Sequence, residues 1–270
     1  MIRVFPRKTN WTPTDKLAFV GIPPHPLFMP PAQPVRISVA FTWDIPGAEM
    51  LEVEWKRYYK DVQVGGPAYG DAGGEFVPGR FVKEGVTITS RGCAKSCPWC
   101  FVPKREGKVR ELEIKDGWIV QDNNLLACSR PHIEAVFSML RRQKKGAIFS
   151  GGLDATLFQD WHRELIDSIK IKELWFACDS VAGIPILDRA ARILDGISIR
   201  RRRCYVMIGY KNETLLDAEK RLEDVLSLGF MPFSQLHQGA EKKKYSRDWM
   251  ALNKKWSRPA AYMPKKGATK

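Results

Sequence analysis

The sequence predicts an α/β protein built around a parallel sheet, and two observations support that fold class. Six short apolar segments with strand character follow one another from about residue 84, and segments with helical periodicity separate them. Strands that alternate with helices in this way are typical of a parallel sheet, either open or closed into a barrel. A strand, a helix and a second strand precede them, and their order predicts a small βαβ unit.

The first region, residues 1–80, combines a proline-rich stretch with this βαβ unit. Pro23-Pro24 and Pro30-Pro31 lie within residues 1–34. Because proline fixes φ and removes a backbone donor, we expect an irregular, extended arm there. The βαβ unit is expected at Val35–Phe41 (strand), Ile45–Tyr59 (helix) and Asp61–Pro67 (strand).

The second region, residues 81–240, holds the core of the predicted fold. Its expected strands are Val86–Ser90, Trp118–Asp122, Ala147–Ser150, Leu174–Cys178, Cys204–Ile208 and Met231–Leu236. Its expected helices are Pro131–Gln143, Leu157–Ile169, Pro185–Leu194 and Leu215–Leu228. Pro131 at a helix start and Gly229 just after a helix end are typical boundary residues.

The charge distribution indicates attraction to a polyanion. With 44 Lys and Arg against 30 Asp and Glu, the formal net charge is +14, which makes nucleic acid a candidate partner. Residues 241–270 form a basic tail that includes Lys265-Lys266 and four aromatic residues, namely Tyr245, Trp249, Trp256 and Tyr262. This tail is either a nucleic-acid platform or an amphipathic helix that packs its aromatic side chains on the core. Arginines 200–203 are expected in a loop or at the barrel mouth, where they would steer an anion.

Neither a membrane-spanning segment nor an export signal is expected. No apolar run reaches the roughly 18–20 residues that a membrane span requires, and the N-terminal residues contain no signal-like apolar stretch. A cytoplasmic location is therefore predicted. In that reducing compartment, grouped cysteines indicate metal or redox chemistry rather than disulfides.

The most specific motif is a C-x3-C-x2-C arrangement directly after the first core strand. Its cysteines are Cys93, Cys97 and Cys100. Thiolates are the usual ligands of iron–sulfur clusters, and three of them leave one iron of a [4Fe–4S] cubane open to a cofactor or substrate. A structural zinc site is the alternative, but zinc requires four ligands, usually in two pairs. The remaining cysteines are isolated in the sequence, so the motif favours the cluster.

This motif resembles that of the radical S-adenosylmethionine (SAM) superfamily, both in its spacing and in Trp99 just before the last cysteine. The resemblance covers roughly residues 82–238 and implies a partial (β/α)6 barrel. It further implies a [4Fe–4S] cluster on the three cysteines and SAM bound at the open iron. One-electron reduction would cleave SAM to methionine and a 5′-deoxyadenosyl radical, which abstracts hydrogen from a substrate. The electron would come from an external donor of flavodoxin or ferredoxin type.

Two segments compete for the family's contact to the SAM amino group; strand counting favours Asp122 and Asn123 after the second strand and keeps Gly152 and Asp154, after the third, as residues near the site. Asp122 and Asn123 are similar to an Asp-Asp-Asn segment of the cobalamin-associated branch of the family. Gly152 and Asp154, in Ser150-Gly151-Gly152-Leu153-Asp154, are similar to the family's Gly-Gly-Glu motif. The alternative for these glycines is a tight turn that requires positive φ.

Three further candidates lie near the cluster or after later strands. Asp179 follows the fourth core strand, where a carboxylate can accept hydrogen bonds from SAM or cap a helix. Gly209 begins a segment similar to the family's loop after strand five and would let the backbone approach the adenosine. Phe101, beside the cluster motif, is expected either to contact the adenine or to lie in the core.

The N-terminal βαβ unit resembles, in part, half of a cobalamin-binding domain. It lacks the Asp-x-His-x-x-Gly motif of that domain, so a structural lid or a substrate platform is expected instead of cobalamin binding. The sequence thus predicts a radical SAM enzyme that modifies an unidentified substrate, with nucleic acid as one candidate; its catalytic residues are not identified. The alternative is a non-catalytic metal-binding module that binds nucleic acid.

Overall fold

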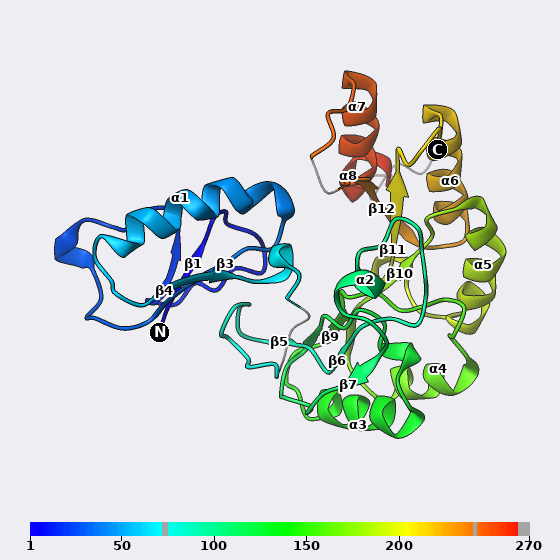
Figure 1. Cartoon of the computed structure of the whole chain (residues 1–270). Helices are drawn as coiled ribbons and strands as arrows, with labels where there is room; N and C mark the ends of the chain where they lie inside the picture. Colours follow the sequence, from blue (N-terminus) through cyan, green and yellow to red (C-terminus); the bar gives the residue numbers. More distant parts are fainter. Residues whose placement is uncertain (72–74, 240–241, 264–270) are drawn as a thin grey trace.

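The computed structural model describes residues 1–71, 75–239 and 242–263. Its N-terminal part is a four-stranded parallel sheet in the order β2-β1-β3-β4, with one α-helix, α1, packed against it (Figure 1). The elements are β1 (Ile2–Phe5), β2 (Ala18–Val20), β3 (Val35–Ser38), α1 (Ile45–Lys56) and β4 (Val62–Gly65). Three short 3-10 helices connect them: η1 (Pro26–Phe28), η2 (Thr42–Asp44) and η3 (Pro67–Tyr69).

The predicted βαβ unit is confirmed as β3, α1 and β4, but the irregular arm is wrong in part. Strands β1 and β2 form within it, and β1 occupies the middle of the sheet between β2 and β3. The side chains of Ile2 and Val4 are fully buried beneath α1, together with Trp55. The prolines instead lie in the loop around η1. With only four residues, β1 offers too short an alternation to stand out in the sequence.

The second part contains a six-stranded parallel sheet whose strands lie side by side in chain order, β5-β8-β9-β10-β11-β12. These strands are β5 (Val86–Thr87), β8 (Ile119–Val120), β9 (Ala147–Phe149), β10 (Ile171–Ala177), β11 (Arg202–Ile208) and β12 (Met231–Leu236). All six predicted strands are therefore present, although β5 and β8 are only two residues long. The α/β class with parallel sheets is confirmed.

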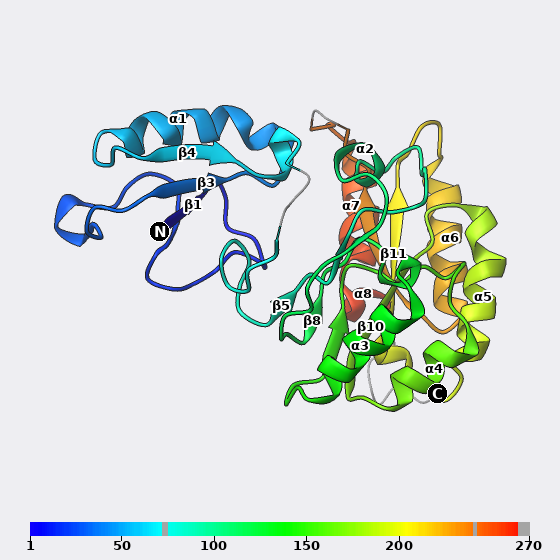
Figure 2. The same cartoon turned by 60° about the horizontal axis from the view of Figure 1, so that its bottom comes forward.

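Four helices cover one face of this sheet, as Figures 1 and 2 show: α3 (Arg130–Arg141), α4 (Asp160–Asp167), α5 (Ile184–Ile193) and α6 (Leu215–Ser227). Alternate strand side chains such as Phe176 and Val206 are buried against Leu187 of α5 and Leu222 of α6. The intervening residues point to the opposite face. There Trp175 stacks on Tyr205 with ring centroids 4.3 Å apart, and Phe233 packs edge-on against both.

The remaining elements lie around the strand ends and at the C-terminus: β6 (Ser90–Arg91), α2 (Val102–Arg105), β7 (Arg110–Glu111), η4 (Leu125–Ala127), η5 (Val181–Gly183), η6 (Ile199–Arg201), α7 (Arg247–Trp256) and α8 (Pro259–Tyr262). Helix α7 packs on β12, where the Ser234 hydroxyl donates to the Asn253 carbonyl at 3.0 Å. Trp256 is 3% exposed, so the amphipathic alternative for the tail is confirmed for this side chain. Lys265-Lys266 lie outside the described residues.

Arg200 and Arg201 lie in a connection between two elements, as one alternative predicted, but none of arginines 200–203 lies at the barrel mouth. They lie in η6 and at the start of β11, which is the amino end of that strand. The barrel mouth expected for them would be at the carboxyl ends. Within the described ranges, no helix combines the length and apolar character that crossing a membrane requires.

Candidate functional site

The three motif cysteines lie in one loop at the carboxyl edge of the six-stranded sheet. The loop leaves the sheet after β5 and is closed at its base by the antiparallel pair β6 and β7. Gly92 begins it with φ of +83°, and a Cβ there would lie 2.1 Å from the Lys108 carbonyl oxygen. Only glycine fits this approach. The Cys93 amide donates to the Gly107 carbonyl at 3.1 Å, which completes the closure of the loop.

All three thiols are free and half-buried. Burial raises the pKa of the Cys97 thiol, and the nearby thiolates of Cys100 and Cys93 raise it further. Burial also raises the pKa of Cys100, with contributions from Cys93 and from the Asp179 carboxylate. These charge effects are consistent with thiols that lie in one region near Asp179, where a bound cation would favour their ionised form.

Trp99 holds the cysteine loop against two neighbouring strand ends. Its side chain hydrogen-bonds to Asp179, which follows β10, and its ring packs edge-on against Tyr210, which follows β11, at 5.5 Å. Asp179 also accepts a hydrogen bond from the Met207 amide at 2.9 Å. Burial raises the pKa of Asp179, while the Met207 bond and the Arg221 charge act in the opposite direction. The structure therefore brings Trp99 and Asp179 together.

The Asp122 carboxylate, which was predicted to contact SAM, is turned toward donors of the protein itself. Its side chain is 1% exposed and accepts three hydrogen bonds, from the Thr89 amide (2.7 Å), the Thr89 hydroxyl (2.6 Å) and the Ser90 hydroxyl (2.7 Å). Burial raises its pKa, although these bonds favour the charged form. Asn123 accepts from the Gly92 amide at 3.0 Å. Both side chains thus fix the segment that enters the cysteine loop.

Two residues that the sequence reasoning missed connect this segment to Asp154. The Asn124 amide lies 3.5 Å from the Cys93 sulfur and donates to the Asp154 carboxylate at 3.1 Å. Lys95, inside the cysteine motif, forms an ion pair with Asp154 at 2.7 Å. Burial alone would raise the pKa of Asp154, but the hydrogen bonds from Lys95 and Thr156 lower it. The place of Lys95 between two cysteines was the signal in the sequence.

Asn124 carries an unusual polar atom. Its side-chain oxygen is buried and has no hydrogen-bond partner, although its amide group is engaged by Cys93 and Asp154. Buried amide oxygens are nearly always paired in folded proteins. An unpaired acceptor beside the cysteine loop marks the kind of position where a ligand donor would be accommodated.

The two glycines after β9 have different roles. Gly151 packs against the neighbouring strand end, since a Cβ there would lie 2.0 Å from the Asp122 carbonyl oxygen. Gly152 has φ of +98°, and a Cβ there would meet nothing within 4 Å. The positive-φ turn expected as the alternative is present at Gly152. Its backbone also faces open space, as a ligand contact requires.

Gly209 and Phe101 occupy surroundings that the sequence did not reveal. Gly209 has φ of +74°, but a Cβ there would lie 2.7 Å from the Tyr245 ring. Tyr245 therefore covers the face that was expected to approach adenosine. Phe101 is 48% exposed, so the alternative that placed it in the core is wrong. Its contact with adenine stays a prediction.

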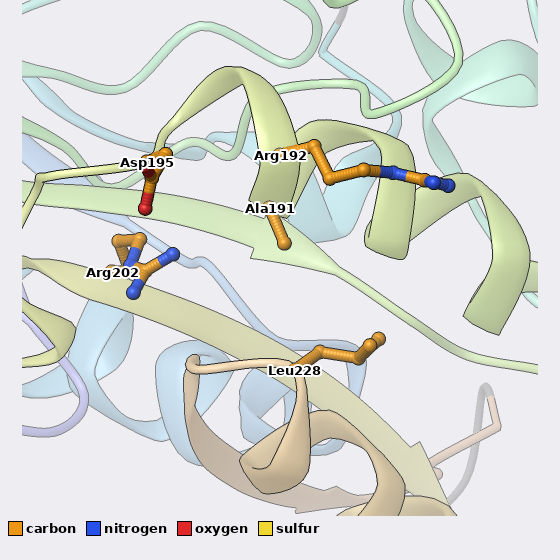
Figure 3. A pocket seen from close by; sticks show the side chains of 5 residues that line it. All are labelled: Ala191, Arg192, Asp195, Arg202 and Leu228. Atoms are coloured by element: carbon orange, nitrogen blue, oxygen red, sulfur yellow. The ribbon is translucent and has the colours of Figure 1, made fainter.

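A hollow in the surface lies away from the carboxyl edge of the six-stranded sheet. Its volume is about 370 Å³. Figure 3 shows it between α5 and the start of β11, with Asp195 and Arg202 turned toward each other. Because Arg202 is the first residue of β11, the hollow lies at the amino ends of the strands. Ligands of parallel α/β sheets bind at the carboxyl ends, so we assign no site here.

Within the described ranges, no three Cys, His, Asp or Glu side chains converge as they would on a single metal ion. A [4Fe–4S] cubane does not require such convergence, because each thiolate binds a different iron. The donor set of three free thiols on one loop, beside an unpaired amide oxygen, fits a cluster with one open iron.

Comparison with protein-family models and with curated proteins found no match to this chain. The assignment of the site therefore depends on the residues and on their geometry.

Proposed function

We propose that this chain is a radical SAM enzyme with a [4Fe–4S] cluster on Cys93, Cys97 and Cys100, and that its six-stranded sheet is the partial barrel of that family. The observation that carries the proposal is the loop of three free, half-buried thiols at the carboxyl edge of the parallel sheet. When bound, the cluster would supply the electron that cleaves SAM. The electron reaches the cluster from an external donor of flavodoxin or ferredoxin type.

The residues around the loop keep the thiols in place. Trp99 is held by Asp179 and Tyr210, and the base of the loop is closed by Gly92 and its hydrogen-bonded neighbours. Asp122 ties the strand ahead of the loop to β8. Because every one of these contacts involves a strand end, the position of the thiols is set by the sheet rather than by the loop alone.

The residues around Asp154 have the chemistry to bind the polar end of SAM. Asp154 is a carboxylate whose pKa is lowered, and it already accepts from Lys95, Asn124 and Thr156, so the ammonium of SAM would bind there in place of the Lys95 ammonium. Gly152 offers open backbone beside it, and the unpaired oxygen of Asn124 can accept one further hydrogen bond. We therefore assign SAM recognition to Asn124, Gly152 and Asp154 in place of Asp122.

The test is anaerobic reconstitution with iron and sulfide, followed by reduction in the presence of SAM. Expected results are about four irons and four sulfides per chain and formation of 5′-deoxyadenosine, measured by chromatography. Both should be lost in Cys97→Ala. The matched control is Cys178→Ala, which removes a buried thiol outside the loop and should retain the cluster.

Two outcomes would contradict the proposal. Binding of one zinc per chain, with no iron–sulfur absorption, would favour the non-catalytic metal-binding module. Equal loss of the cluster in Cys97→Ala and Cys178→Ala would mean that the loop thiols are not its specific ligands.

A further inference from the structure

A second hollow lies on the same edge of the sheet as the cysteine loop. It has a volume of about 240 Å³ and is lined by residues that follow β11 and by residues at and before the start of α7: Gly209, Lys211, Glu213, Lys243, Lys244, Tyr245, Ser246 and Trp249. Tyr245 fixes its wall by donating to the His237 carbonyl at 2.6 Å. The hollow is therefore built from two segments that are separate in the sequence.

The charge of this hollow is positive. Its acid, Glu213, is compensated by an ion pair with the buried Arg221 and by a hydrogen bond from the Gly209 amide at 2.7 Å. Its three lysines have no ion-pair partner among the described residues.

The backbone at Lys211 supports a specific role for this cluster of charge. Lys211 has φ of +52°, the one non-glycine residue with positive φ in the described part of the chain. A lysine in this conformation carries a strain cost of about 1 kcal/mol or more. Strained residues of this kind concentrate at ligand-binding positions.

Aromatic side chains connect the hollow to the cysteine loop. Tyr245 and Trp249 line it, and their rings pack edge-on at 6.1 Å. Tyr210, between Gly209 and Lys211, contacts Trp99 of the cysteine loop at 5.5 Å and His237 at 4.8 Å. A ligand held in the hollow would thus lie one aromatic residue away from the loop that carries the thiols.

We infer that this hollow is a subsite for the phosphate of a single-stranded nucleic acid, held by Lys211, Lys243 and Lys244 with Trp249 beside it for stacking. Ammonium groups next to aromatic rings are the combination that binds single strands. The hollow is smaller than the roughly 300–1,000 Å³ that encloses a whole small ligand, so it suits one unit of a longer chain. The protein's net charge of +14 favours binding of the remaining phosphates of that nucleic-acid strand. The role of this strand as substrate rests on the proposed function, whereas its binding does not.

Fluorescence anisotropy with a labelled single-stranded oligonucleotide of about 12 residues tests the inference on the full chain. The variant Lys211→Ala/Lys243→Ala/Lys244→Ala should bind at least about tenfold more weakly. Its log–log salt slope should be smaller by about 0.7, since one phosphate contact is lost. The matched control, Lys16→Ala/Lys60→Ala/Lys144→Ala, removes the same charge from exposed positions and should change the affinity by less than about twofold.

Trp249→Leu should weaken binding by about tenfold without changing the salt slope, because stacking releases no counterions. Circular dichroism of each variant confirms that the fold is retained. Equal losses in the two triple variants would overturn the inference, since binding would then follow net charge alone. Equal competition by a mononucleotide and by the oligonucleotide would overturn the strand as ligand and indicate a free nucleotide.

The same measurements separate this inference from the proposed function. Oligonucleotide binding that depends on the three lysines, in a chain that forms no 5′-deoxyadenosine, would support the subsite and contradict the enzyme. SAM cleavage, together with oligonucleotide binding that is insensitive to the three lysines, would support the enzyme and contradict the subsite.

Discussion

The two parallel sheets of this chain are packed alike but carry different residues at the carboxyl ends of their strands. In the small sheet, the polar pair near these ends is Arg7 and Asp44, which bond to each other. In the six-stranded sheet, β5, β8, β9 and β10 are followed by the cysteine loop, Asn124, Asp154 and Asp179 in turn. The comparison teaches that a parallel sheet supplies a shared edge, whereas the chemistry depends on which side chains occupy it.

The largest expected difference between the sheets is in the free energy of unfolding that is lost when a buried carboxylate is removed. Asp122→Ala should lower the free energy of unfolding by about 4 kcal/mol, because three donors of Thr89 and Ser90 lose their buried acceptor. Asp44→Ala should cost about 1 kcal/mol, since its partner Arg7 is 46% exposed and can hydrate. Urea unfolding followed by circular dichroism measures both. Similar losses would show that the two edges are equally rigid.

A smaller difference is expected in how the free energy of unfolding changes at acid pH. Burial lowers the pKa of His162, at the start of α4, to about 4, and its ring accepts a hydrogen bond from the Gln159 amide at 3.0 Å. Because the unfolded chain takes up this proton at higher pH, the stabilisation is complete above about pH 6.5 and is lost as the pH falls toward 4. The loss amounts to about 3 kcal/mol.

His162→Gln keeps a side-chain acceptor at this capping position but cannot titrate, so its stability should vary less between pH 7 and pH 4. His25→Gln, at an exposed position of the small region, is the matched control for the substitution. Urea unfolding at each pH provides the measurement. An unchanged pH dependence in His162→Gln would show that other groups cause it.

The smallest difference lies between two adjacent glycines. Gly151→Ala should destabilise the chain by about 2 kcal/mol, because its Cβ would overlap backbone atoms of Asp122. Gly152→Ala should cost about 1 kcal/mol, from its positive φ alone. Thermal unfolding compares the two variants. A cost for Gly151→Ala no greater than that for Gly152→Ala would mean that this strand end can move aside.

Much of the fold followed from local patterns in the sequence. The six core strands and the helices between them were predictable because each has its own apolar periodicity. Strand β1 was not, since it becomes a strand only through parallel partners on both sides. The small sheet therefore depends more on tertiary contacts than on local sequence.

The candidate site was predictable only where residue type and spacing alone decide. The cysteine motif met that condition. Asp122 did not, because a sequence does not tell whether a carboxylate after a strand points toward a ligand or back to Thr89 on a neighbouring segment. Likewise, Tyr245 covers Gly209 from 36 positions further along the chain, a contact that no local pattern announces.

The chain-order arrangement of β5 to β12 has a consequence for how the protein is made. Each strand of this sheet pairs with the strand of the same sheet that precedes it in the chain, so each step closes only the crossover connection between two successive strands. The sheet can therefore grow during translation, from its first strand outward. The cysteine loop, which follows that first strand, emerges from the ribosome long before Tyr245 and Trp249. The proposed cluster could thus be loaded before the basic hollow beside it is complete.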